Sequence, residues 1–190
     1  MFTHAVDSLL GRFDACPWGG MAGRPVRREA RRLYTPEERR RRDASPWTLV
    51  QGVLAPVQFA IFLVSLVLVL RCLMTGSGEG AAVLSVVVKT AALYLIMVTG
   101  SIWERDVFGR YLFAPAFFWE DVVSMLVLAL HTAYLVALLS GAMDTRRLML
   151  LALAAYGTYV VNAAQFLVKL RAARLEGRWQ GQAARLGRAS

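Results

Sequence analysis

Three carboxylates and one histidine of this chain lie within or at the edge of long apolar stretches. The acidic residues are Glu104, Glu120 and Asp121, and the histidine is His131. Ionisable side chains in such stretches are costly to insert into a bilayer and usually mark a functional site. Carboxylic acids held close together and partly protonated can transfer protons, and each positioned group is typically worth ~10² to 10⁴ in rate. The chemistry that these residues favour is therefore general acid and base catalysis at a membrane.

One apolar segment carries its polar residues on a single helical face. At ~100° per residue, Glu120, Ser124, His131 and Tyr134 fall within about an 80° arc. His131 then lies ~16 Å along the axis from Glu120 at 1.5 Å per residue. Lys89 lies in the preceding apolar segment, away from the face that carries the other polar residues of that segment. Inserting a lysine at this depth costs ~2.5 to 3.5 kcal/mol on insertion scales, so its side chain must snorkel outward or find a partner.

The other two apolar segments contribute amides. Gln51 and Gln58 are seven residues apart and share a face, and Asn162 and Gln165 share one more loosely. Together with the acidic residues they predict a polar cavity that opens toward the cytoplasm. The candidate substrate-binding residues are His131, Ser124, Tyr134, Gln51, Gln58, Asn162, Gln165 and Trp119.

Each of these polar groups also has a purely structural interpretation. Ser, Asn and Gln side chains hold membrane helices together through hydrogen bonds, and a neutral His131 can do the same. Glu120 and Asp121 in a first turn favour a helix N-terminus. Trp119 is typical of the aromatic belt at a membrane interface.

Four segments must position these residues, and their composition identifies the class of protein. The chain is 57% hydrophobic, which is too high for an ordinary soluble domain of 190 residues. Each segment has about the ~20 residues that a helix needs to cross ~30 Å of hydrocarbon. We therefore predict an all-α polytopic membrane protein, a bundle of four transmembrane helices. Their expected ranges are about 47–70, 81–103, 116–139 and 148–168.

Basic residues gather at the two ends of the chain. The formal net charge is +9, and of the 22 Lys and Arg residues 10 precede Trp47 and 6 lie from Lys169 onward. By the positive-inside rule, this places both termini in the cytoplasm. The same distribution leaves no folded basic face, so nucleic acid is not an expected partner. Neither a disulfide framework nor a zinc site is available from Cys16 and Cys72.

The domain organisation follows from the segments and charges. Residues 1–46 form an Arg-rich cytoplasmic leader in which no core is expected, 47–170 the transmembrane domain, and 171–190 a basic cytoplasmic tail. The start of the leader has acidic and basic residues where a signal peptide needs an apolar run, so the first membrane helix is the expected targeting signal.

Several long strings of this sequence carry a family resemblance. They are TPEERRRRDASPWTLVQGVLAPVQF at 35–59, VTGSIWE at 98–104, FAPAFFWEDV at 113–122, NAAQFL at 162–167 and KLRAARLE at 169–176. These strings resemble the 3-vinyl (2-vinyl) bacteriochlorophyllide hydratases of anoxygenic phototrophic bacteria, over about residues 34–177. Residues 1–33 exceed the family pattern; they are either a lineage-specific extension or the result of a start codon placed upstream of Met21.

The resemblance implies a hydro-lyase of bacteriochlorophyll synthesis in the inner or photosynthetic intracytoplasmic membrane. Its reaction is the addition of water to the C3 vinyl group of a chlorophyllide or bacteriochlorophyllide, giving a 1-hydroxyethyl group. No cofactor is implied beyond water and the magnesium of the substrate. The bilayer and other enzymes of bacteriochlorophyll synthesis are the further partners expected.

For this reaction we hypothesise that Glu120 is the general acid and that Glu104 or Asp121 orients the water. His131 is either an axial ligand of the substrate magnesium or a hydrogen-bond donor to the macrocycle. The main alternative is a non-catalytic membrane carrier or assembly factor for tetrapyrroles, which would use His131 but need no carboxylates. A transporter is a further alternative, although no pair of discontinuous half-helices is evident.

Overall fold

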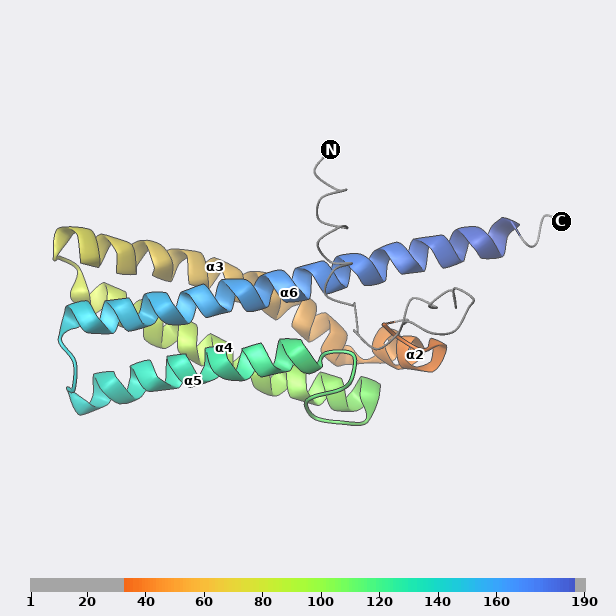
Figure 1. Ribbon diagram of the computed structural model, residues 1–190, viewed down its shortest axis with the longest axis horizontal. Coiled ribbons are helices and arrows are strands. Elements are labelled where there is room, and N and C mark those ends of the chain that lie inside the picture. The colour runs from red at the N-terminus through yellow and green to blue at the C-terminus, as the bar shows by residue number, and fades with distance from the viewer. Residues whose placement is uncertain (1–32, 187–190) are drawn as a thin grey trace, which may run out of the picture. The chain divides into compact units, whose positions relative to one another are not determined.

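The computed structural model describes residues 33–186, and side chains as far as residue 173. Within this part of the chain all regular structure is helical (Figure 1). The helices are α2 (Pro36–Ala44), α3 (Pro46–Thr75), α4 (Glu79–Phe108), α5 (Phe118–Ser140) and α6 (Thr145–Leu186). Four of them, α3 to α5 and the Thr145–Ala173 part of α6, are long and apolar enough to cross a membrane. The predicted all-α fold with four candidate membrane spans is confirmed.

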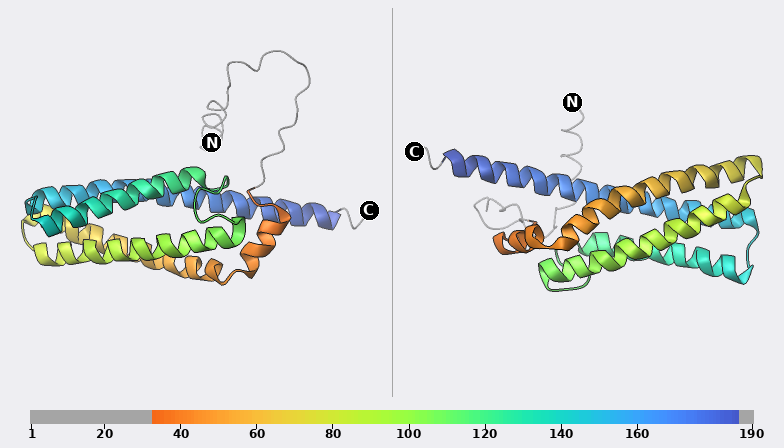
Figure 2. Two further views of the ribbon diagram at one scale, coloured as in Figure 1. Left: turned by 90° about the horizontal axis from the view of Figure 1, so that it is seen from below. Right: turned by 180° about the vertical axis from the view of Figure 1, so that it is seen from behind.

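The four long helices run up and down through short connections (Figures 1 and 2). The α3–α4 and α5–α6 turns lie together at one end, while α2 and the α4–α5 link lie at the other. Helices α3 and α5 each end at a glycine in the left-handed conformation, Gly76 with φ 66° and Gly141 with φ 63°. A residue without a Cβ adopts this conformation at little cost, which allows the chain to reverse within a few residues.

Two helix pairs make up the bundle. Helix α3 packs most extensively on α4, α5 packs most extensively on α6, and α3 and α6 join the two pairs. The core between them contains Phe62 of α3 and Tyr156 of α6, whose rings meet edge to face at 5.4 Å. Helices α4 and α5 touch much less, and the hydrogen bond of 2.6 Å between Tyr94 and Thr132 is one of their links.

Large apolar side chains cover the outside of the bundle. Leu49, Val67 and Leu139 are all more than half exposed. Lipid tails are as apolar as these side chains, so their exposure carries no penalty in a bilayer, and close packing with hydrogen bonds must hold the helices together.

Helices α3, α4 and α6 are longer than the predicted spans, whereas α5 is about as long as predicted. Helix α3 continues five residues beyond the expected end at residue 70, and α4 continues to Phe108 instead of 103. Hydropathy identifies the length covered by hydrocarbon, whereas a helix continues into the interface until its backbone meets a stop such as Gly76 or Gly109.

A small cap closes the end of the bundle at which α3 begins. Thr35 and Glu38 form a reciprocal capping box at the start of α2. Tyr34 is buried and its ring stacks on Phe108 at 5.7 Å, and Arg42 lies 4.8 Å above the same ring. The expectation that no core forms before residue 47 is therefore wrong at Tyr34, because aromatic residues from the α4–α5 region supply a surface that the leader alone lacks. Helix α2 itself has no buried residue. The predictions for residues 1–32, an extension or an upstream start, lie outside the described residues.

Candidate functional site

The link between α4 and α5 is held by two carboxylates. The backbone N–H of Ala114 donates to Glu104 Oε1 at 2.9 Å, and that of Phe113 donates to Asp121 Oδ2 at 2.7 Å. Phe113 has a φ of 60°, which is uncommon for a residue with a side chain. The two hydrogen bonds thus fix a strained link between the last turns of α4 and the first turn of α5.

The same two carboxyl groups lie close to each other. They accept from the amides of two consecutive residues at the α4–α5 link, and both side chains are buried. Two carboxylates in one buried site repel each other, which favours a proton on one of them. The pair therefore combines a proton donor and a proton acceptor at one place.

Glu120 points to the other side of α5 and meets α6. Its Oε2 atom lies 2.5 Å from Lys169 Nζ, and the ammonium group also lies 4.8 Å from the centre of the Phe117 ring. Adjacent residues of a helix diverge by ~100°, which explains why Glu120 and Asp121 have different partners.

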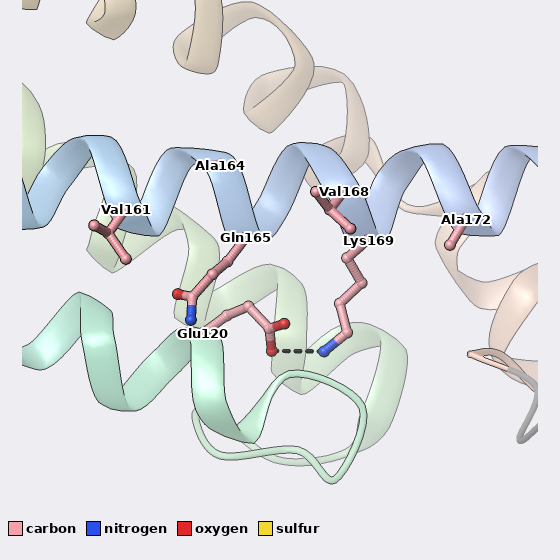
Figure 3. Close-up of a pocket in the computed structure, with 7 residues that line it drawn as sticks. All are labelled: Glu120, Val161, Ala164, Gln165, Val168, Lys169 and Ala172. Carbon is pink, nitrogen blue, oxygen red and sulfur yellow. Dashed lines mark hydrogen bonds and ion pairs between the residues drawn. The ribbon is translucent and has the colours of Figure 1, made fainter. Parts of the chain in front are cut away.

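The Glu120–Lys169 pair borders a pocket of about 540 Å³ between α5 and α6 (Figure 3). Small-molecule sites are commonly ~300 to 1,000 Å³ and mostly apolar with a few polar groups. Its lining residues are Glu120, Val161, Ala164, Gln165, Val168, Lys169 and Ala172. In Figure 3, the side chain of Gln165 extends from α6 toward Glu120.

A buried amide continues the polar surface from this pocket into the bundle. Asn162 Nδ2 donates to Ser124 Oγ at 2.7 Å, joining α6 to α5. Asn162 Oδ1 and Gln165 Oε1 are buried and have no hydrogen-bond partner in the described part of the chain. Ser124 and Asn162 are thus joined across the α5–α6 contact, and Gln165 lines the pocket together with Glu120.

Two predicted site residues lie on the opposite helix pair. Gln51 of α3 donates through Nε2 to Thr99 Oγ1 of α4 at 2.8 Å. Gln58 is buried farther along α3, and its Nε2 has no partner among the described residues. Gln51 is thus used in the α3–α4 contact, and neither glutamine lines the α5–α6 pocket.

His131 lies deep in the bundle and is fully buried. Its Nδ1 is 2.8 Å from the carbonyl oxygen of Val127. A carbonyl can only accept, so Nδ1 carries a proton and, in the neutral ring, Nε2 keeps its lone pair. Nε2 has no partner among the described residues. Tyr134 is equally enclosed, and its hydroxyl group is also without a partner there.

Lys89 follows the second of the two sequence-based expectations, a partner inside the bundle. Its side chain is fully buried and does not snorkel outward. Its partner is an aromatic ring, because Nζ lies 3.6 Å from the centre of the Tyr159 ring. A desolvated cation over such a ring gains about 2 kcal/mol or more.

Trp119 is 69% exposed on the outer surface of α5, where its ring meets that of Phe118 at 5.5 Å. It belongs to neither the Glu104–Asp121 pair nor the Glu120–Lys169 ion pair. This position suits either an interface anchor or a wall for a ligand that enters from lipid.

The sequence analysis did not identify Lys169 or the backbone N–H groups of Phe113 and Ala114 in the α4–α5 link. Lys169 continues the spacing of Asn162 and Gln165 by four further residues, so helical periodicity could have placed it on the same face. The amides of Phe113 and Ala114 carry no comparable signal, because backbone groups leave no pattern in side-chain types. No group of three or more His, Cys, Asp or Glu that could hold a metal ion occurs among the described residues.

Comparison with known proteins gives one family. The family model for 2-vinyl bacteriochlorophyllide hydratase matches residues 34–172. A protein of that name from Rhodobacter capsulatus is 63% identical over 156 residues, which cover 82% of this chain and 91% of the relative. Another from Cereibacter sphaeroides is 64% identical over 146 residues, 77% of this chain and 91% of the relative. No solved structure matches the chain.

Proposed function

The chain belongs to the 2-vinyl bacteriochlorophyllide hydratase family, and we propose that it adds water to the C3 vinyl group of a chlorophyllide or bacteriochlorophyllide. The product carries a 1-hydroxyethyl group at this position, and the enzyme is a hydro-lyase. The membrane character of the chain suits such a substrate, because the macrocycle is apolar and partitions into lipid.

The reaction begins with proton transfer to the terminal vinyl carbon. The resulting cation at the inner carbon is delocalised into the conjugated ring, which lowers its energy. Water then attacks the inner carbon and loses a proton. One proton is consumed and one is released, so a group that gives the first and takes the second is regenerated in each cycle.

The observation that carries this proposal is the proximity of the buried Glu104 and Asp121 carboxyl groups, which accept from consecutive amides of the α4–α5 link. A carboxyl pair that shares a proton can deliver it to the vinyl group and then accept one from the attacking water. The Phe113 and Ala114 amides hold the two acceptor oxygens in place during this exchange.

Glu120 suits the role of acid less well in this geometry. It is ion-paired with Lys169 across the α5–α6 contact, whereas Glu104 and Asp121 lie together at the α4–α5 link. The hypothesis that Glu120 is the acid thus stays a prediction, and we assign proton transfer to the Glu104–Asp121 pair instead.

His131 is proposed as the axial ligand of the substrate magnesium, or as a polar contact to the macrocycle. The lone pair expected on Nε2 supports the ligand role. Because the His131 side chain is fully buried, the substrate macrocycle can reach it only if neighbouring helices move apart.

Vinyl hydration is the test of this function. Membranes of a heterologous host that express the chain are incubated with a 3-vinyl chlorophyllide. We expect a product heavier by one water, with its longest-wavelength absorption band shifted to the blue because vinyl conjugation is lost. Glu104→Gln and Asp121→Asn should each lower the rate by about 10² to 10⁴. Glu37→Gln is the matched control, since Glu37 is an exposed acid of α2. A protein that binds the pigment but leaves its vinyl group intact would instead be a carrier.

We further propose that the protein lies in the inner or photosynthetic intracytoplasmic membrane with both termini in the cytoplasm. The basic ends of the chain support this orientation. The α4–α5 link lies at the same end of the bundle as α2 (Figure 1), so the carboxylate pair would be at the cytoplasmic side. Reporter fusions to each terminus, active only in the cytoplasm, test the orientation.

A further inference from the structure

We propose that Lys169 binds the propionate carboxylate of the tetrapyrrole substrate in the α5–α6 pocket and so positions the ring. This inference rests on the proposed function, because the free carboxylate is what distinguishes a chlorophyllide from its esters. Lys169 was not among the candidate site residues predicted from the sequence.

The shape and composition of the pocket fit one edge of an amphipathic ring. Four of its lining residues are apolar and lie along α6, namely Val161, Ala164, Val168 and Ala172. The two alanines leave room for a flat ligand against the helix. The polar residues of the pocket are Glu120, Gln165 and Lys169, and Lys169 is the one cation among its lining residues.

Lys169 is already placed to receive a carboxylate. Its Nζ atom lies 2.5 Å from the Glu120 carboxylate, which shows that a carboxyl group fits beside the ammonium at hydrogen-bonding distance. An ammonium has three N–H donors, and this bond to Glu120 uses one of them. A second carboxylate can therefore bind without removing the first.

The surroundings of Lys169 suit its ammonium group and leave it open to a ligand that approaches from outside the bundle. The Lys169 side chain is 23% exposed and that of Glu120 11%, so the ammonium is the more accessible member of the pair. The ring of Phe117, 4.8 Å away, supports the cation from another side. A substrate that moves in from the bilayer would meet apolar α6 side chains with its ring and Lys169 with its carboxylate.

Binding of the ring to Lys169 also determines what the vinyl group can reach. Asp121 follows Glu120, the ion-pair partner of Lys169, directly in α5. A ring held at Lys169 thus has one edge beside the helix turn that carries the Glu104–Asp121 pair. Lys169 is a positioning residue in this account, not one that transfers the proton.

The test compares chlorophyllide with its propionate methyl ester on purified protein in detergent. Binding is followed by the change in pigment absorption, and hydration by chromatography. We expect the unmodified protein to bind the acid about 10- to 100-fold more tightly than the ester. Lys169→Gln should weaken binding of the acid to the level of the ester and leave ester binding unchanged, while Lys169→Arg keeps part of the preference. Arg171→Gln is the matched control, because Arg171 is a neighbouring α6 cation that does not line the pocket.

The outcomes separate this inference from the proposed function. Equal binding of acid and ester by the unmodified protein would overturn the role of Lys169 even if both pigments are hydrated. If Lys169→Gln weakened binding of both the acid and the ester, this would also overturn the proposed role, because such a result indicates that Lys169 is structural. Absence of hydration, with a preference for the acid that Lys169→Gln removes, would support the carboxylate site and reject the hydratase.

Discussion

Glu104 and Asp121 come from different helices, yet their buried carboxyl groups lie close together and each accepts an amide of the same nine-residue link. Few contacts join α4 and α5 elsewhere. The pair therefore links two helices that are otherwise loosely associated, and it brings two carboxyl groups near enough to share a proton.

The two members of this pair should act as one unit. If they share the catalytic proton, Glu104→Gln and Asp121→Asn each lower the hydration rate by about 10² to 10⁴. The double variant should then be little slower than either single one, because effects of groups that act together are not additive. Initial rates in membranes with equal amounts of protein measure this. Independent losses that multiply in the double variant would contradict a shared role.

The Glu120–Lys169 ion pair should contribute to stability as a pair. Lys169→Met leaves Glu120 buried without its cation, and we expect a loss of about 1 to 3 kcal/mol in the free energy of unfolding. Combining it with Glu120→Gln removes the unpaired charge and should restore most of that loss. Thermal unfolding of the three variants in one detergent gives the coupling. Additive changes would mean that the two residues are not coupled.

Sequence periodicity predicted which residues of each helix are polar but not which of them meet. Glu104, Glu120 and Asp121 were predicted as one set of carboxylates. Instead, Glu120 pairs with Lys169, while Asp121 binds the same link as Glu104, because consecutive residues diverge around α5. The partner on each side depends on the order of helices, and that order depends on packing between α3–α4 and α5–α6. Lys89 shows the same limit, because the sequence predicted that it would snorkel outward or find a partner but did not identify that partner as the ring of Tyr159.

His131 should recognise the magnesium of the substrate if Nε2 is an axial ligand. The unmodified protein then binds magnesium chlorophyllide about 10-fold more tightly than the magnesium-free pigment, as expected for one additional polar interaction. His131→Gln should remove this difference while the magnesium-free pigment binds as before. Absorption titrations with the two pigments are the measurement. If His131 only joins helices, its replacement would weaken binding of both pigments equally or of neither.

Lys89 should be dispensable for stability, since its charge is buried without a hydrogen-bond partner among the described residues. A lysine within the membrane costs ~2.5 to 3.5 kcal/mol on insertion scales, and its contact with Tyr159 returns about 2 kcal/mol. Lys89→Met keeps the length of the side chain and removes both terms, so the free energy of unfolding should rise by about 0 to 2 kcal/mol. Hydration should continue at a similar rate, because Lys89 lies about 15 residues, or ~22 Å of helix, from Glu104. Thermal unfolding and the hydration assay on the same preparation check both expectations. A variant that is stable yet inactive would show that the buried cation takes part in function.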